Sequence, residues 1–343
     1  MSSYDALLVV SFGGPEGMDE VKPFLENVTR GKNVPRERIE EVARHYELFG
    51  GVSPANAQIR ELIGALEAEL GTHGPPLPVY WGNRNWRPML ADTLRRMAKD
   101  GIGKALAFIT SAFSSYSGCR QYLEDIERAR AEVGPEAPQV DRLRAFYNHP
   151  GFIEANIENT RTAFERVPAE RREAGPLVFT AHSLPRSMAA GCDYEMQLLE
   201  TCRLVAEGVH REGWRLAYQG RSGPRHQPWL EPDIRDCLGE LGRRGVRDVV
   251  VLPVGFLSDH MEVVYDLDVE ARGLADQMGL HLVRAATVGT HPRFVRMIRE
   301  LVIERWTESP ERVFLGVHGP SHDVCAEDCC LPAEPSPLPP RPG

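Results

Sequence analysis

The sequence predicts an α/β protein built from two similar halves, each containing a parallel sheet. Short, β-rich apolar runs alternate with amphipathic helical patterns, which is typical of βαβ units. The expected strands lie at 6–12, 77–82, 105–110, 176–181, 216–220, 248–256 and 281–287. The same order of strand, long helical excursion and further strand–helix pairs occurs twice, and a cleft between two such halves is a common ligand site.

A helical segment near 149–167 joins the two halves and sets the expected boundary between them. We expect an N-terminal half over residues 1–150 and a C-terminal half over residues 151–318. Residues 319–343 form a Cys- and Pro-rich tail. Its last part, LPAEPSPLPPRPG, cannot pack a core, so we expect the tail to be flexible.

Composition and charge exclude several classes of protein. The formal net charge is −9 and no block of Lys and Arg stands out, whereas nucleic-acid binding needs a clustered basic face. No apolar stretch approaches the roughly 20 residues of a membrane span, and the N-terminus lacks the basic region of a signal peptide. We expect a cytoplasmic protein without a membrane span.

Three loops near the expected strands have a composition suited to ligand binding. SFGGPEG at 11–17 makes either a tight turn or an anion site, but it is not the G-x-G-x-x-G fingerprint of nicotinamide enzymes. FGGVSPAN at 49–56 offers Ser53 as a helix N-cap or as a hydroxyl for a ligand carboxylate. The small residues of 110–126 leave room for a flat ligand beside Tyr122, or form a plain loop before a helix.

The clearest chemical signal lies at the ends of two expected strands. His182 follows the apolar run 176–181, and an acidic segment follows the run 248–256. On a helix, Glu262, Asp266 and Glu270 would form one acidic stripe, since they stand four residues apart. Such like-charge pairs cost a few tenths of a kcal/mol each, which a divalent cation would relieve. A solvated acidic face is the alternative.

A histidine and a carboxylate that face each other can perform two kinds of chemistry. Imidazole and oxygen ligands together suit Fe²⁺. The same two groups can instead accept protons as general bases. The sequence leaves both roles open for His182 and Glu262.

Several blocks resemble the ferrochelatases, in the order that this family has them. They are HSLP (182–185), YQGRSGPRHQPWLEPD (218–233) and LPVGFLSDHMEVVYDLDVE (252–270), supported by LLVVSFGGPEG (7–17), FGGVSP and TSAFSSYS. The resemblance covers residues 5–318. It implies two Rossmann-like halves with a porphyrin in the cleft between them, and a reaction that inserts Fe²⁺ into the porphyrin.

The resemblance also implies roles for single residues. The family's metal-insertion histidine corresponds to His182 and its paired carboxylate to Glu262, while its outer metal path corresponds to Asp266 and Glu270. The family's porphyrin contacts correspond to Arg30, Tyr46, Ser53 and Tyr122. The expected partners are therefore a porphyrin and ferrous iron as substrates, together with other enzymes of heme biosynthesis.

The segment 26–54 most resembles the actinobacterial branch, which is associated with coproporphyrin III and its product coproheme. A protoporphyrin IX ferrochelatase that makes protoheme is the alternative. More distant alternatives are another tetrapyrrole metal chelatase and a non-catalytic tetrapyrrole carrier. A carrier would not need both His182 and Glu262.

The cysteines of the tail form a separate candidate site. Some ferrochelatases bind a [2Fe–2S] cluster through C-terminal cysteines and one cysteine of the body. Cys325, Cys329 and Cys330 would supply three of the four thiolates. The helical segment 152–159, where animal enzymes carry the body cysteine, has none. The alternative is a solvent-exposed tail of free thiols.

Overall fold

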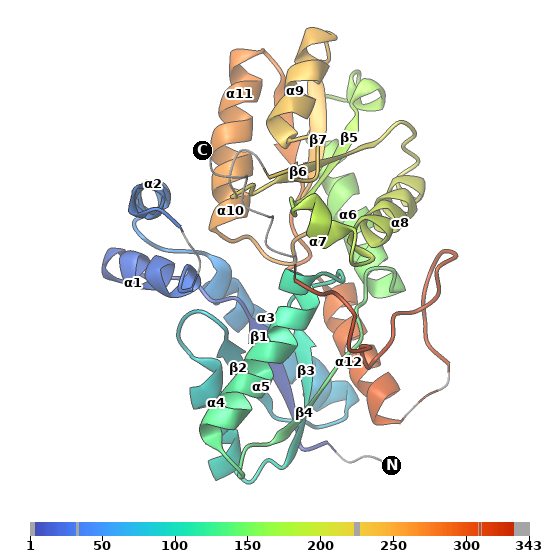
Figure 1. Ribbon diagram of the computed structural model, residues 1–343. Coiled ribbons are helices and arrows are strands. Elements are labelled where there is room, and N and C mark those ends of the chain that lie inside the picture. The colour runs from blue at the N-terminus through green and yellow to red at the C-terminus, as the bar shows by residue number, and fades with distance from the viewer. Residues whose placement is uncertain (1–3, 32–33, 223–226, 308, 310, 333–343) are drawn as a thin grey trace.

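The computed structural model describes residues 4–31, 34–222, 227–307, 309 and 311–332. It is an α/β structure with two four-stranded parallel sheets, which lie in the lower and upper parts of Figure 1. The predicted fold class is confirmed. Within these described ranges, no helix is long and apolar enough to cross a membrane.

The first sheet has the strand order β2-β1-β3-β4. Its strands are β1 (Ala6–Ser11), β2 (Val79–Asn83), β3 (Lys104–Ile109) and β4 (Gln139–Arg142). Side chains of β1 alternate between two apolar layers: Leu8 packs with helices α4 (Leu90–Lys99) and α5 (Gln121–Val133), and Leu7 packs with α3 (Ala55–His73). Because both faces of the sheet are covered, β1 is apolar throughout.

The second sheet repeats this arrangement with the order β6-β5-β7-β8. Its strands are β5 (Leu177–His182), β6 (Arg215–Gln219), β7 (Asp248–Leu252) and β8 (His281–Arg284). One face packs on α9 (Ile234–Arg243) and α11 (Arg272–Gln277), and the other on α6 (Pro150–Glu165) and α8 (Tyr194–Gly208). The short helical turns α7 (Arg186–Ala189) and η2 (Arg172–Ala174) lie in the connections before α8 and β5.

Two further segments connect the halves. Helix α12 (Pro292–Trp306) follows the second sheet but packs against α3 and α6, as its place beside the lower part of Figure 1 shows. Helices α1 (Met18–Val28) and α2 (Arg36–Glu47) pack on each other at one side of the molecule. Their apolar faces surround Met261, which belongs to the second half.

All seven expected strands are present, and β4 is an additional one. β4 has the sequence QVDR and lies at the edge of its sheet, so it lacks the apolar run that marks a buried strand. Two segments are π-helices, η1 (Tyr116–Arg120) and η3 (Val264–Ala271). π-helical turns are rare and occur frequently at functional sites. The end of the predicted tail, residues 333–343, lies outside the described residues.

Candidate active site

The structure brings His182 and Glu262 together. His182 is the last residue of β5, and Glu262 lies in the short helix α10 (Met261–Val263) that follows the loop after β7. The distance from His182 Nε2 to Glu262 Oε2 is 3.5 Å. Both strands are parallel neighbours in one sheet, so their carboxyl ends meet at the same edge.

Local contacts fix the orientation of the His182 ring. Its Nδ1 lies 2.5 Å from the Ser183 carbonyl oxygen, which leaves Nε2 directed to Glu262. The Tyr194 hydroxyl donates to the His182 carbonyl oxygen at 2.9 Å. Gly220 lies so close to the ring that an added Cβ would be 2.7 Å from Nε2. The sequence analysis did not single out Gly220, although its place directly after β6 was a signal for a close backbone approach.

The acidic residues continue from Glu262 along the π-helix η3. Asp266 is close enough to both Glu262 and Glu270 for each of the two carboxylates to raise its pKa. Gln219, at the end of β6, donates from Nε2 to the Glu262 carbonyl oxygen at 3.2 Å and to Asp266 Oδ2 at 3.4 Å. The expected acidic stripe therefore exists, but on a π-helix, which the i, i+4 spacing alone did not predict.

The charges of the central pair support each other. Burial disfavours the imidazolium of His182, but the Glu262 carboxylate and the Ser183 carbonyl outweigh it, and the pKa of His182 rises to about 9. The Glu262 side chain is half-exposed; the surrounding protein opposes its ionisation, but the imidazolium outweighs this and the pKa of Glu262 falls below its usual range. Without substrate the two groups thus form an imidazolium–carboxylate pair. Burial, Glu262 and Glu270 raise the pKa of Asp266 to about 7.

Of the four expected porphyrin contacts, Tyr46 lies nearest the pair. Burial and the charge of Glu262 raise its pKa, and its ring packs with Phe24 and Met261. Phe24 in turn contacts Phe12, whose side chain is 44% exposed. A buried apolar cluster therefore lies beside the His182–Glu262 pair, and Phe12 is its exposed neighbour.

The other three expected contacts have different surroundings. Ser53 is buried, and its Oγ accepts a long hydrogen bond of 3.4 Å from the Ala55 amide, as expected near a helix start. Arg30 is exposed and forms no ion pair with the residues described. Tyr122 is buried in the core of the first half, and the Arg84 guanidinium lies 4.3 Å above its ring. The structure does not bring Tyr122 next to the His182–Glu262 pair.

The tail cysteines form a second cluster of chemically active groups. One ligand atom each from His322, Cys325 and Cys329 lies within 4.8 Å of the other two. Cys330 is buried, and its Sγ lies 3.6 Å from that of Cys329. The sequence analysis missed His322, whose place three residues before Cys325 was an available signal.

A cysteine of the body also joins the cluster. Cys119, at the π-helix η1, is in hydrogen-bond contact with Cys325, and this contact lowers the pKa of Cys119 against the opposing effect of burial. Arg142 Nη1 donates to Cys119 Sγ at 2.8 Å and assists the same shift. Segment 152–159 contains no cysteine, as the sequence analysis noted. Cys119 is the body cysteine that the tail reaches.

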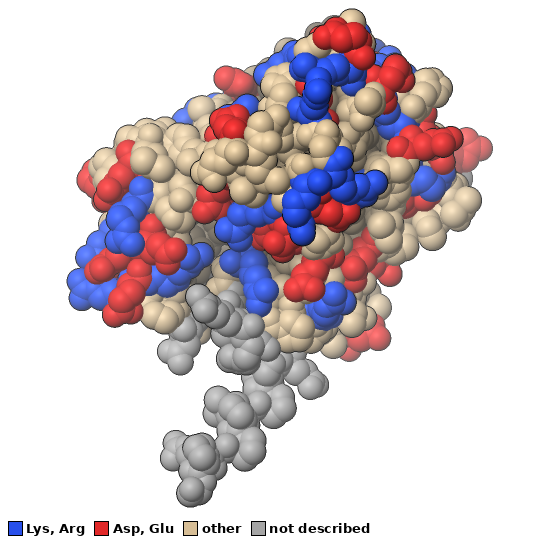
Figure 2. Space-filling view, turned by 90° about the horizontal axis from the view of Figure 1, so that it is seen from above, with Lys and Arg blue, Asp and Glu red and all other residues tan. Residues whose placement is uncertain are grey.

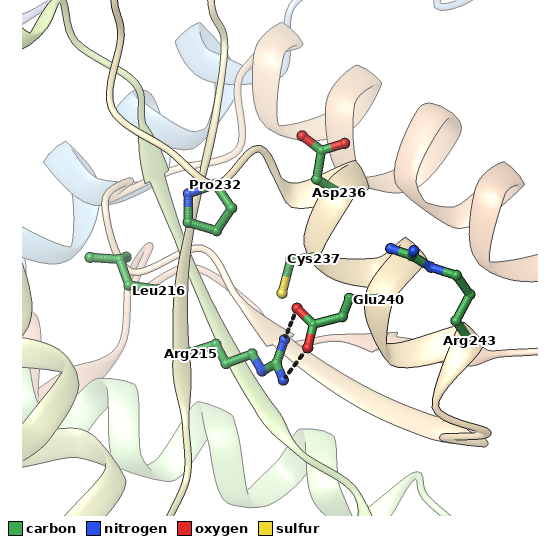
Figure 3. Close-up of a pocket in the computed structure, with 7 residues that line it drawn as sticks. All are labelled: Arg215, Leu216, Pro232, Asp236, Cys237, Glu240 and Arg243. Atoms are coloured by element: carbon green, nitrogen blue, oxygen red, sulfur yellow. Dashed lines mark hydrogen bonds and ion pairs between the residues drawn. The ribbon is translucent and has the colours of Figure 1, made fainter.

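One cavity lies apart from both sites. It has a volume of about 550 Å³ and lies between β6 and α9. Figure 3 shows Arg215 and Glu240 paired across it, with two contacts of 2.9 and 3.0 Å, and the Cys237 thiol beside them. None of the expected site residues lines this cavity.

The structure resembles chelatases of known structure. SirB from Bacillus subtilis with Fe³⁺ matches with a TM-score of 0.57 at 13% identity, covering 89% of this chain and 98% of SirB. The cobalt complex of the sirohydrochlorin chelatase SirB from B. subtilis subspecies spizizenii matches with a TM-score of 0.53. At this identity the likeness establishes the fold, which is that of a chelatase.

The sequence comparisons establish the family. Residues 4–306 match the family model "Ferrochelatase". A ferrochelatase of Rhodopirellula baltica is 55% identical, with 96% of this chain and 93% of the relative covered. Coproporphyrin III ferrochelatases of Nocardia farcinica and Streptomyces griseus are 52% and 49% identical, covering 96% and 97% of this chain and 97% and 95% of each relative. The chain belongs to the ferrochelatase family, whose enzymes insert iron into a porphyrin.

Proposed function

We propose that this ferrochelatase inserts Fe²⁺ into coproporphyrin III and releases coproheme. The observation that carries the proposal is the similarity to coproporphyrin III ferrochelatases over nearly the whole chain. Coproporphyrin III has four propionates, two more than protoporphyrin IX. On a chain of net charge −9, these anions need local cations or hydrogen-bond donors.

The arm formed by α1 and α2 supplies such groups. Arg30 follows α1, is exposed and has no partner among the residues described, so its guanidinium is available to a carboxylate. On the face seen in Figure 2, groups of basic side chains lie next to groups of acidic ones. We propose Arg30, Tyr46, Ser53 and Tyr122 as porphyrin contacts, with the apolar cluster of Phe24, Tyr46 and Met261 beside the macrocycle.

We propose His182 and Glu262 as the catalytic pair. Metal insertion requires two groups near the ring nitrogens that bind the metal and remove the two pyrrole protons. The carboxylate of Glu262 is ionised and can accept a proton at once, whereas His182 carries one already. Arrival of Fe²⁺ would disfavour the imidazolium, because like charges repel. His182 would then release its proton to solvent and offer Nε2 to the metal. Glu262 would take the two pyrrole protons in turn and pass the first to solvent before it accepts the second.

We propose that Asp266 and Glu270 extend the site into a route for metal or protons. The route begins at the catalytic pair and follows the π-helix η3 outward. With a pKa of about 7, Asp266 exchanges its proton near neutral pH, which suits a group that passes either cations or protons onward.

The substrate proposal is tested by kcat/KM for coproporphyrin III and protoporphyrin IX under anaerobic conditions with Fe²⁺. A shielded charge-assisted hydrogen bond contributes about 1.5–3 kcal/mol, and we therefore expect a preference for coproporphyrin III of about tenfold or more. Arg30→Ala should reduce this preference, while Arg243→Ala, which also removes an exposed arginine but on α9, should not. Equal or better use of protoporphyrin IX by the wild type would favour a protoheme-forming enzyme.

We further propose that the tail cluster binds a [2Fe–2S] cluster. The residues fit this group, because thiolates are its usual ligands and Cys119, Cys325, Cys329 and Cys330 provide four, with His322 beside them. When bound, such a cluster supplies one-electron redox chemistry. Arg142 holds the tail in place here: it donates to the carbonyl oxygens of Asp323 at 2.9 Å and of His322 at 3.0 Å.

Iron and acid-labile sulfide in freshly purified protein test the cluster. We expect the wild-type protein to contain iron and acid-labile sulfide and to absorb visible light. Cys119→Ser should lose the iron, the sulfide and the absorption. Cys237→Ser is the matched control, because Cys237 is also buried but lies in α9. Truncation after His318 should likewise remove the sulfide. A colourless wild-type protein without sulfide would show that the tail carries only thiols.

The remaining parts of the proposal concern the division of the chain into domains, the cellular location and the partner enzymes. We propose that the division into halves at residue 150 and a tail from residue 319 describes the folding units. We also propose that the enzyme acts in the cytoplasm, which is supported by its seven free thiols, and that it passes its product to other enzymes of heme biosynthesis.

A further inference from the structure

Arg142 is a buried cation without a carboxylate partner among the residues described. It is the last residue of β4 and is 8% exposed. Its Nε and Nη2 donate to the carbonyl oxygens of Asp323 and His322, at 2.9 and 3.0 Å, and its Nη1 donates to Cys119 Sγ at 2.8 Å. Two of the three acceptors are therefore neutral backbone oxygens, and the third is a sulfur.

A buried guanidinium in these surroundings requires a counter-charge. Removing a cation from water costs several kcal/mol unless an anion compensates for it. Arg144, which is also buried, shows the usual solution, because its Nε and Nη2 donate to the Glu304 carboxylate at 2.7 and 3.0 Å. The anion that balances Arg142 must come from the side of the guanidinium that faces the sulfur.

The tail cysteines lie on that side. Cys119 is in hydrogen-bond contact with Cys325. The charge of Arg142 also reaches Cys325 and Cys329, since it favours the thiolate form of both. As free thiols these groups are neutral and leave the guanidinium unbalanced. As ligands of the proposed [2Fe–2S] cluster they are thiolates, and the loaded site carries a net negative charge that increases when one electron is added.

We propose that Arg142 is the counter-charge of the tail cluster and raises its reduction potential. This inference rests on the cluster proposed above. The positive charge and the hydrogen bond to Cys119 Sγ both stabilise the more negative, reduced state. Net charge and hydrogen bonds to sulfur are two of the factors that set the potentials of such clusters. Reduction adds one electron to a ferric ion and breaks no bond. Arg142 is thus a positioning residue that acts on the metal through a ligand sulfur.

The test is the reduction potential of the purified holoenzyme, measured by anaerobic redox titration with dithionite and mediators and followed by visible absorption. Arg142→Gln removes the charge but keeps an amide donor. At a fixed potential, we expect its ratio of reduced to oxidised cluster to fall about tenfold, which corresponds to a potential lower by about 59 mV for one electron. Arg142→Lys keeps the charge and should keep most of the wild-type potential.

Arg120→Gln is the matched control, because Arg120 also holds the tail but has its own counter-charge. Its Nη1 donates to the carbonyl oxygens of Glu327 at 2.5 Å and of Cys329 at 3.0 Å, and its Nε donates to Glu124 Oε1 at 3.1 Å. This variant weakens the attachment of the tail without removing an unbalanced charge. We expect its reduction potential to stay near that of the wild type.

Several results would overturn the proposal. One is an Arg142→Gln cluster with an unchanged reduction potential. Another is a fall in Arg142→Gln that Arg142→Lys or Arg120→Gln matches, which would make Arg142 only an anchor of the tail. Loss of acid-labile sulfide from both Arg142 variants would have the same meaning, whereas loss from Arg142→Gln alone would support the proposal, because the charge is then needed to hold the cluster. A wild-type protein without sulfide would refute the cluster itself, and this proposal with it.

Discussion

Gly220 leaves room for the imidazole of His182. Gly220 has a φ of +74°, and a Cβ at this position would lie 2.7 Å from Nε2 and 2.8 Å from Cδ2 of His182. These distances are shorter than any normal van der Waals contact. The His182 side chain is therefore positioned partly by the absence of a side chain at Gly220, the residue directly after the neighbouring strand β6.

Gly220→Ala should impair catalysis more than stability. The methyl group would displace the imidazole, and a shift of about 1 Å in a reacting group can reduce turnover by about 100-fold. Gly213→Ala is the matched control, because Gly213 has a φ of +68° but no atom within 4 Å of an added Cβ. Both variants should lose similar stability from the positive φ. Equal turnover in the two variants would show that Gly220 matters only for its backbone.

The three carboxylates of the acidic segment should differ in their effects on catalysis. We expect Glu262→Gln to lower kcat by about 100-fold or more, as for loss of a general base. Asp266→Asn and Glu270→Gln should mainly raise KM for Fe²⁺, since they lie further from His182. Steady-state kinetics at varied Fe²⁺ concentration measures this. The same loss of kcat in all three variants would contradict a graded route.

Asp266 should make the protein less stable as the pH rises. Its folded-state pKa of about 7 exceeds the usual aspartate pKa of 3.8, so the folded state binds more protons between these pH values. The contribution of Asp266 to the free energy of unfolding is thus greatest below pH 4 and is lost as the pH rises through 7. Asp266→Asn should remove this pH-dependent loss of stability. The loss in the free energy of unfolding is at most about 4 kcal/mol, because one pKa unit corresponds to about 1.4 kcal/mol.

Urea unfolding of wild type and Asp266→Asn at pH 5 and pH 8 measures the effect. We expect the asparagine variant to be more stable than the wild type at pH 8, with a smaller difference at pH 5. A difference that does not change with pH would mean that the Asp266 carboxyl titrates normally.

Features that depend on a local pattern of residues could be predicted from the sequence. Apolar runs predict all strands except β4, whose QVDR sequence at a sheet edge has no apolar run. His182 and Glu262 were recognisable because each follows a buried strand, and neighbouring parallel strands end at one edge. The π-helical form of η3 could not be recognised from the sequence, because the spacing of its acidic residues also fits an α-helix.

Contacts between distant parts of the chain could not be predicted from local sequence patterns. Cys119 reaches Cys325 where Arg142 on β4 and Arg120 hold the tail against the first half. The hydrogen bonds from Gln219 to Glu262 and Asp266 depend on the register between β5 and β6, which no local pattern specifies. Tyr122 has its ring in the core of the first half beneath Arg84, a contact that the sequence did not indicate, and its role as a porphyrin contact stays a prediction.

The most direct test of the catalytic pair is turnover by His182→Ala, measured anaerobically with Fe²⁺ and coproporphyrin III alongside porphyrin binding by fluorescence quenching. His182 lies 3.5 Å from Glu262 and is the imidazole that we propose as the metal's ligand at the macrocycle. We predict that the variant binds porphyrin with affinity close to that of the wild type and inserts no measurable iron. Insertion at a rate near that of the wild type would contradict the assignment of the His182–Glu262 pair.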